Sequence, residues 1–187
     1  MNREIVLSNA AAQKGNALRL LLFALTLGLD QITKYWARAH FSLPSGEPDY
    51  YRSIRIIGEW IQFRLVYNHG AAFGMKPQNL LPFLHPTLFY TLFSLAAIVV
   101  LILYYRRLGR HETWLKSGVV LILSGAAGNL IDRMLLHKVT DFIDVGIVGF
   151  YPRWPTFNVA DSAVCIGVGI LLIAPIFLKP RPPLAHA

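Results

Sequence analysis

Three aspartates, Asp141, Asp144 and Asp161, lie just before or just inside an apolar run that is long enough to cross a bilayer. An ionised carboxylate at a membrane boundary is costly, so each needs a partner or a function. Taken singly, they have ordinary explanations. Asn158 can cap the following helix, which makes Asp161 its third residue, where the helix dipole favours a carboxylate. Asp141, one residue after Thr140, can be a solvated loop residue or can cap a turn.

Two carboxylates held close together in a water-poor site have a chemistry that neither has alone. Both cannot stay ionised, so the pair shares one proton. The ionised member can take a proton from water, while the protonated member hydrogen-bonds the carbonyl of a scissile bond. Asp141 and Asp161 are the candidates for this pair. Such chemistry is that of an aspartic peptidase, and it uses neither a serine or cysteine nucleophile nor a metal.

The composition indicates that these acids belong to a membrane protein. The chain has 187 residues, of which 55% are hydrophobic and 15% charged, and its mean hydropathy is +0.46. Its formal net charge is +8. The basic residues are scattered between apolar segments and form no continuous basic face, so we reject nucleic-acid binding. Lys and Arg beside membrane spans account for the excess charge.

Four segments approach the length of about 20 residues that a membrane-spanning helix needs. They are residues 18–36, 86–105, 114–134 and 159–178, which leave an outer loop at 37–85 and a disordered tail at about 180–187. We therefore expect an all-α polytopic membrane protein with one membrane-embedded domain over residues 1–187. Lys and Arg before the first span, between the second and third, and after the fourth predict cytoplasmic N- and C-termini.

The long outer loop contains a pattern typical of strands. Hydrophobic residues alternate along "IQFRLVY" at 61–67, and the apolar stretch "SIRII" precedes them at 53–57. This pattern predicts a small antiparallel sheet outside the membrane. In the next stretch, the spacing favours Asn68 to Phe73 as a turn in which glycines serve the backbone geometry. The alternative is a rigid loop that presents backbone amides or Asn68 to an extended peptide. The stretch from Asn68 to Pro86 is thus expected to be a turn followed by a segment at the membrane interface that enters the second span.

With this topology, four polar clusters gather on one membrane face: "DQITKYW", "NHGAAFG", "GNLIDRM" and "FNVAD". Such convergence is typical of a functional cavity. Asp30 and Lys34 are four residues apart, so they share a helix face and can pair, with or without a direct role in a site. Asn129 and Arg133 are also four apart, and we favour them as polar contacts between helices.

The third and fourth spans carry small residues at a spacing that favours close helix packing. Ser124 and Gly128 are four residues apart in the third span, and Ala163 and Gly167 are four apart in the fourth. This spacing lets two helix backbones approach closely inside a membrane. We therefore expect these two spans to pack against each other.

The motifs "DQITKYW", "NHGAAFG", "GNLIDR", "VTDFIDV" and "FNVADSAV" occur in the order found in lipoprotein signal peptidases, also called signal peptidase II. The chain resembles this family from the first span to the fourth. The resemblance implies an aspartic endopeptidase of the bacterial inner membrane, with four helices and an external β-cradle. It also implies cleavage of a prolipoprotein just before its diacylglyceryl-modified cysteine.

By this resemblance, Asp141 and Asp161 are the catalytic pair. Further positions that match family motifs, and would position or bind the substrate, are Asp30, Lys34, Asn68, Gly70, Asn129, Arg133, Asn158 and Ala160. His69 is treated as variable and Asp144 as part of a polar rim. The implied partners are a lipid-modified prolipoprotein and membrane lipids, without nucleic acid, cofactor or metal. We expect a monomer whose active site lies near the outer face.

Two other functions are compatible with some of these residues. A membrane phosphotransferase acting on lipid headgroups could bind Mg²⁺ if Asp144 joined the other two aspartates as ligands, and it would then be inactivated by EDTA. A small transporter or proton relay could use Asp30, Lys34, Asp132 and Arg133 along a pathway. A relay should distribute ionisable groups through the membrane, but the middles of the second and fourth spans contain none.

Overall fold

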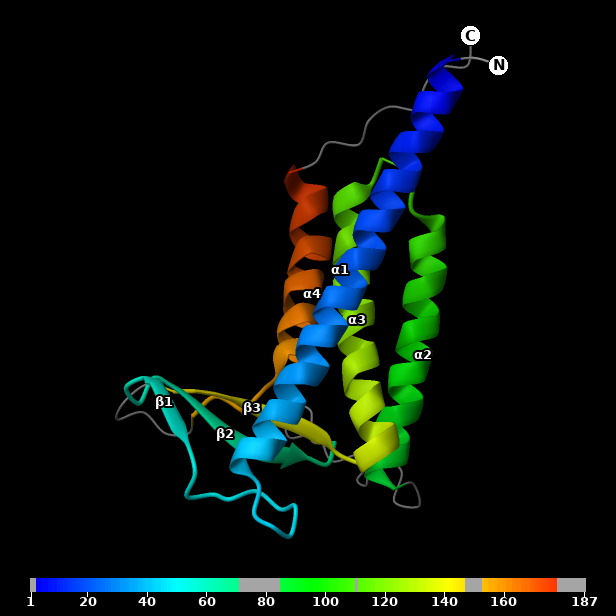
Figure 1. Ribbon diagram of the computed structural model, residues 1–187. Coiled ribbons are helices and arrows are strands. Elements are labelled where there is room, and N and C mark those ends of the chain that lie inside the picture. Colours follow the sequence, from blue (N-terminus) through cyan, green and yellow to red (C-terminus); the bar gives the residue numbers. More distant parts are fainter. Residues whose placement is uncertain (1–2, 71–84, 110, 147–152, 178–187) are drawn as a thin grey trace.

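The computed structural model describes residues 3–70, 85–109, 111–146 and 153–177, and for residues 3–12 it describes the backbone alone. Its elements are α1 (Arg3–Phe41), β1 (Ile54–Ile57), β2 (Ile61–Asn68), α2 (Pro86–Arg107), α3 (Thr113–Leu136), β3 (Val139–Val145) and α4 (Val159–Phe177). The helices lie alongside one another, and the sheet extends sideways from one end of them (Figure 1). The predicted disordered tail and most of the expected interfacial segment lie outside the described residues.

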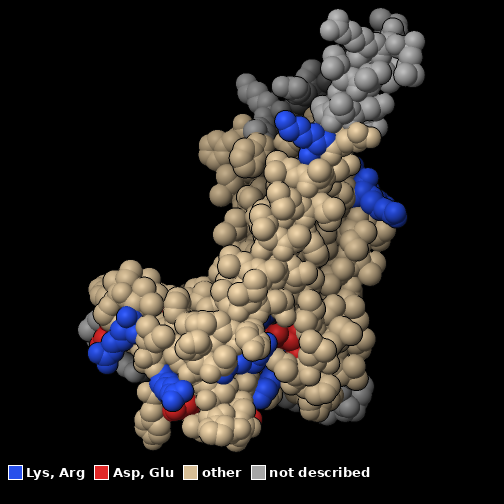
Figure 2. Space-filling view, in the orientation of Figure 1, with Lys and Arg blue, Asp and Glu red and all other residues tan. Residues whose placement is uncertain are grey.

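Three helices in the described part of the chain, α2, α3 and α4, are long and apolar enough to cross a membrane. They begin within one residue of the predicted second, third and fourth spans. Helix α1 contains the predicted first span but runs further in both directions. On the face seen in Figure 2, charged residues gather toward the two ends of the described helices, and the stretch between them is free of charge. This distribution is typical of helices surrounded by lipid.

The small sheet has the order β1-β2-β3, and both strand pairs are antiparallel. The predicted strands around 53–57 and 61–67 are confirmed by β1 and β2. The third strand was not expected. Asp141 lies inside β3 and pairs with Val66 of β2, and Thr140 pairs with Tyr67. The expectation of a solvated loop at Asp141 is therefore wrong, because β2 supplies backbone partners for a β-branched and aromatic stretch.

A hydrophobic cluster attaches the sheet to the helices. Ala37 and Phe41, near the end of α1, pack with Leu65 of β2 and Phe142 of β3, and all four are buried. Trp36 contacts the same cluster and meets Phe142 edge-on. Because Phe142 follows Asp141 directly, this packing helps to fix the strand that carries the acid.

Helices α3 and α4 pack closely, as their small residues predict. Ser124, Gly128, Ala163 and Gly167 are all buried. A Cβ atom added at Gly167 would overlap the carbonyl oxygen of Gly118 on α3. The two backbones thus meet at distances that larger side chains would not allow.

Candidate active site

Asp161 is fixed at the start of α4 by a reciprocal cap. Oδ1 of Asn158 accepts a hydrogen bond of 2.9 Å from the backbone N–H of Asp161. In return, Oδ2 of Asp161 accepts one of 3.1 Å from the backbone N–H of Asn158. The predicted cap is confirmed, and its form is that of a capping box. The other carboxylate oxygen accepts a bond of 2.8 Å from Nδ2 of Asn129 on α3.

Asp141, on strand β3, contacts Asn158, the residue that caps α4. Its side chain is only 2% exposed, and its Oδ1 accepts a 2.7 Å hydrogen bond from Nδ2 of Asn158. A side-chain hydrogen bond from Asn68, the last residue of β2, also reaches the carboxyl group. Asn158 therefore contacts both Asp141 and Asp161. The two acids, twenty residues apart in sequence, share one buried polar site.

The environment of Asp141 favours its protonated form. Burial raises the pKa of the Asp141 carboxyl to about 7, and the negative charge of Asp161 acts in the same direction. The hydrogen bonds from Asn68 and Asn158 and the positive charge of Lys34 oppose this increase in pKa. Near neutral pH, Asp141 can therefore hold a proton that an exposed aspartate would have lost.

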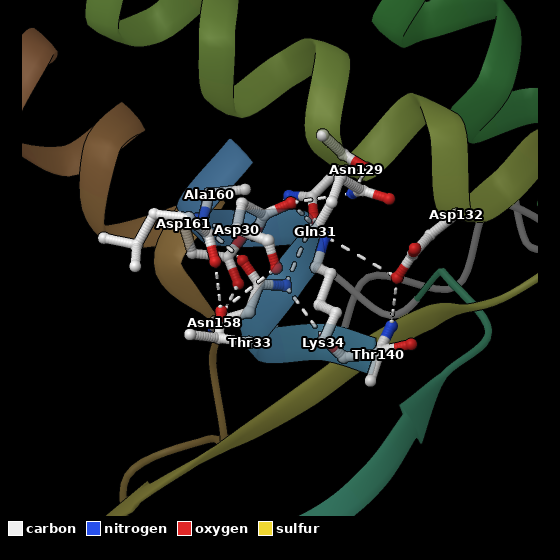
Figure 3. Close-up of polar contacts among 12 residues, drawn as sticks. Asp30, Gln31, Thr33, Lys34, Asn129, Asp132, Thr140, Asn158, Ala160 and Asp161 are labelled. Atoms are coloured by element: carbon white, nitrogen blue, oxygen red, sulfur yellow. Dashed lines mark hydrogen bonds and ion pairs between the residues drawn. The ribbon is translucent and has the colours of Figure 1, made fainter. Parts of the chain in front are cut away.

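Helix α1 contributes a buried ion pair next to these acids. Nζ of Lys34 lies 3.0 Å from Oδ2 of Asp30, and both side chains are fully buried, so the predicted pairing is confirmed. The same nitrogen donates to Oδ1 of Asn129 at 2.9 Å. Oδ1 of Asp30 accepts a 2.9 Å bond from the backbone N–H of Ala160 on α4. Figure 3 shows these side chains converging between α1, α3 and α4.

Helix α3 approaches α1 closely at this pair, since a Cβ atom added at Gly128 would overlap the carboxylate of Asp30. One turn further along α3, Arg133 lies over the ring of Tyr90 on α2, with its Cζ 5.9 Å from the ring centroid. The charge of Arg133 also interacts electrostatically with Asp161 and Asp141. All four helices thus supply residues to one region at the sheet end of the bundle.

Comparison with known proteins identifies the family. A family model described as "Signal peptidase (SPase) II" matches residues 22–177. The chain belongs to the signal peptidase II family. A lipoprotein signal peptidase from Pseudomonas fluorescens is 37% identical over 172 residues, covering 88% of this chain and 91% of the relative. One from Psychromonas ingrahamii is 38% identical over 170 residues, covering 88% of each chain.

A solved structure described as "Bacterial membrane enzyme structure by the in meso method at 1.9 A resolution" resembles this signal peptidase II family member. The TM-score is 0.70 at 26% sequence identity, and the match covers 88% of this chain and 95% of that one. The chain is accordingly a peptidase of a membrane-enzyme family. This assignment favours the peptidase over the phosphotransferase and the transporter.

The structure brings the expected signal peptidase II site residues together. Those within the hydrogen-bonded group around the two acids are Asp30, Lys34, Asn68, Asn129, Asn158 and Ala160. Gly70 adjoins this group, because its backbone N–H donates to Oδ1 of Asn68 at 2.9 Å. His69 is exposed, and the described contacts give it no role in the site.

The expectation that Asp144 belongs to a polar rim is wrong. Its side chain is buried, and its carboxylate lies 2.9 Å from Nε of Arg64 and 3.0 Å from Nε of Arg153. These partners hold Asp144 in the sheet, apart from the two acids at Asn158. It is therefore not the third free carboxylate that the phosphotransferase alternative required. Within the described ranges, no group of three or more His, Cys, Asp or Glu residues is arranged to hold a metal ion.

One residue of the site, Asp132, was named in the sequence analysis only for the transporter alternative and was not predicted to lie at the two acids. Asp132 is buried on α3, and its Oδ2 accepts a 2.8 Å hydrogen bond from the backbone N–H of Thr140. The same oxygen lies 3.5 Å from Nζ of Lys34. A signal was present in the sequence, because an acid within a membrane-spanning segment is rarely without a function.

Proposed function

We propose that this chain removes signal peptides from bacterial prolipoproteins, cleaving just before the diacylglyceryl-modified cysteine by attack of water activated by Asp141 and Asp161. The observation that carries the proposal is that Asn158 hydrogen-bonds both carboxyl groups in a buried site. Membership of the signal peptidase II family supports the choice of substrate. The residues that hydrogen-bond the pair would position it or the extended peptide.

In the proposed mechanism, Asp141 holds the shared proton and Asp161 is ionised. Asp161 accepts a proton from water as the oxygen attacks the scissile carbonyl carbon, and Asp141 gives its proton to the carbonyl oxygen. The tetrahedral intermediate then collapses as Asp161 donates the proton that it took from water to the nitrogen and the C–N bond breaks. One hydroxyl of the intermediate returns a proton to Asp141, which restores the shared proton of the pair. The products are a signal peptide with a new carboxyl terminus and a lipoprotein whose modified cysteine carries a free amino group.

The lipid chains of the substrate would bring the scissile bond to the site. Acyl chains partition into the bilayer, which holds the modified cysteine near the membrane boundary. The signal peptide must leave its helical conformation there, because carbonyls bonded within a helix are not accessible to the attacking water. The sheet beside the site would hold this extended segment. Confinement of this kind supplies much of the positioning that catalysis requires.

We further propose that α1 is a fourth membrane span. Its outward side chains include Leu18, Leu25 and Ile32, all well exposed in the chain by itself, whereas its charged Asp30 and Lys34 are fully buried. This is the arrangement that lipid surroundings favour. The start of α1, the α2–α3 connection and the end of α4 lie at one end of the molecule (Figure 1). Positive charges near those segments would place this end in the cytoplasm and the site near the outer face of the inner membrane.

The test is cleavage of a lipid-modified prolipoprotein by the purified, reconstituted protein. Wild type, Asp141→Asn and Asp161→Asn are compared with and without EDTA. We expect cleavage by wild type in both conditions and none by either variant, although both variants fold. Asp144→Asn is the matched control, because it neutralises a buried acid whose ion pairs in the described part of the chain are with Arg64 and Arg153. Substantial turnover by Asp141→Asn or Asp161→Asn, or loss of activity in EDTA, would contradict the proposal.

A further inference from the structure

The residues directly before the two acids are held in the same way. The backbone N–H of Thr140, which precedes Asp141, donates to Oδ2 of Asp132 at 2.8 Å. The backbone N–H of Ala160, which precedes Asp161, donates to Oδ1 of Asp30 at 2.9 Å. The residue before each acid is therefore held, through its backbone N–H, by a second, buried carboxylate.

A single cation joins those two supporting carboxylates. Nζ of Lys34 lies 3.0 Å from Asp30 and 3.5 Å from Asp132, and all three side chains are almost completely buried. Figure 3 shows Lys34 between the two carboxylates, with Thr140 on one side and Ala160 on the other. We call these three residues the Asp30–Lys34–Asp132 bracket. It connects β3 to the start of α4 through α1 and α3.

Lys34 also determines how Asn129 is oriented. An ammonium group can only donate hydrogen bonds, so the oxygen of the Asn129 side chain must face it, as it does at 2.9 Å. The Nδ2 group is then left to donate to Oδ1 of Asp161 at 2.8 Å. Nη1 of Arg38 lies 3.7 Å from Oδ1, the other carboxylate oxygen of Asp132, so Arg38 adds a second, partly exposed cation at that end.

We propose that the Asp30–Lys34–Asp132 bracket sets the separation of Asp141 and Asp161, which makes Asp132 a further positioning residue. The catalytic part of this inference rests on the proposed function; the structural part does not. Without Lys34, two buried carboxylates would face each other with no cation between them, and their repulsion would separate the strand from the helix. Misplacement of a reacting group by about 1 Å can lower a rate by about 100-fold.

Hydrogen exchange tests the bracket independently of any activity. Lys34→Met should accelerate exchange of the backbone amides of both Thr140 and Ala160, by about tenfold or more, because both supports loosen together. Asp132→Ala should accelerate exchange at Thr140 much more than at Ala160. Glu47→Gln is the matched control, since it neutralises an acid in an exposed pair with Lys138 and should change neither amide. Unchanged exchange at both amides in Lys34→Met would overturn the bracket.

The kinetics of cleavage of a lipid-modified prolipoprotein test the effect of the Asp30–Lys34–Asp132 bracket on catalysis. Asp132→Ala should lower kcat by about 100-fold while KM changes by less than about threefold, because the side chain of Asp132 is buried and would not touch the substrate. Asp132→Asn can still accept the Thr140 N–H, so it should retain more kcat than the alanine variant. A wild-type kcat in folded Asp132→Ala, or a change confined to KM, would overturn the positioning role.

A double variant separates the bracket from general damage to the core. Lys34→Met combined with Asp132→Asn removes one of the two repelling carboxylates. Its kcat should therefore exceed that of Lys34→Met alone by about tenfold, which is the non-additivity expected of residues in contact. Strictly additive losses would show that the two residues act independently and would overturn the bracket. If wild type did not cleave prolipoproteins, the proposed function would fail, whereas the exchange result would still decide the bracket.

Discussion

The side-chain amide of Asn158 donates a 2.7 Å hydrogen bond to the carboxyl group of Asp141. The same residue caps α4 with its amide oxygen and gives its backbone N–H to Asp161. One asparagine therefore connects a strand and a helix that carry the two acids. Because its donor and acceptor groups have fixed positions, the hydrogen bonds of Asn158 fix the relative positions of the two carboxyl groups.

Replacement of Asn158 by Ser should separate its two roles. A serine oxygen can still accept the backbone N–H of Asp161 and cap the helix, but it cannot supply the amide donor to Asp141. We expect kcat to fall by about 10- to 100-fold, since a hydrogen bond to a charged or ionisable partner contributes about 1.5–3 kcal/mol. Asn158→Ala, which also loses the cap, should melt at a lower temperature than Asn158→Ser. Wild-type kcat in Asn158→Ser would contradict the assignment.

The activity should decrease on the alkaline side of neutrality. The proposed mechanism needs a proton on Asp141, and burial raises the pKa of that carboxyl to about 7. As the pH rises through this value, the pair loses its shared proton, so kcat/KM should decline between about pH 7 and pH 9. Initial rates of prolipoprotein cleavage across this range measure the effect. A kcat/KM that rises steadily to pH 9 would rule out the protonated role of Asp141.

Stability should also depend on pH through Asp141. Its pKa is about 7 in the folded protein, against an ordinary value of 3.8, so the folded state binds more protons between these pH values. Stability is therefore lost as the pH rises from about 4 through 7. Asp141→Asn removes this loss and should melt roughly 5 °C above wild type at pH 8, with little difference at pH 4. Thermal melts in one detergent at both pH values check this, with Asp144→Asn as the control.

Gly70 should not tolerate a side chain. Its φ is 118°, and a Cβ atom there would overlap the ring of Tyr90. Gly70→Ala should displace Asn68, which hydrogen-bonds Asp141, and we expect cleavage to fall by about tenfold or more. Gly46→Ala is the matched control, since Gly46 also has a positive φ, of 83°, but none of the described residues beyond its two chain neighbours has an atom within 4 Å of a Cβ added there. Equal activity of the two variants would show that the contact with Tyr90 is unimportant.

Much of the architecture follows from local sequence. The apolar runs that form α2, α3 and α4 are long enough to span a bilayer, and a helix satisfies its own backbone hydrogen bonds there. The alternation at 61–67 predicted β2, and a spacing of four residues predicted the pair Asp30 and Lys34. The three-residue spacing of Asn158 and Asp161 predicted the cap. Each of these patterns lies within, or at the start of, a single helix or strand.

The tertiary structure decided which distant groups meet. Asp141 was expected in a loop because Val139–Val145 forms a strand only by pairing with β2, and this pairing is not visible in the local sequence. Asp144 is buried because Arg64 and Arg153 reach it from other segments. Asp132 gained its role from a backbone N–H eight residues later, across the end of α3. Sequence spacing determines which residues share a helix face, but hydrogen bonds between elements depend on how those elements pack, and only the folded chain establishes that packing.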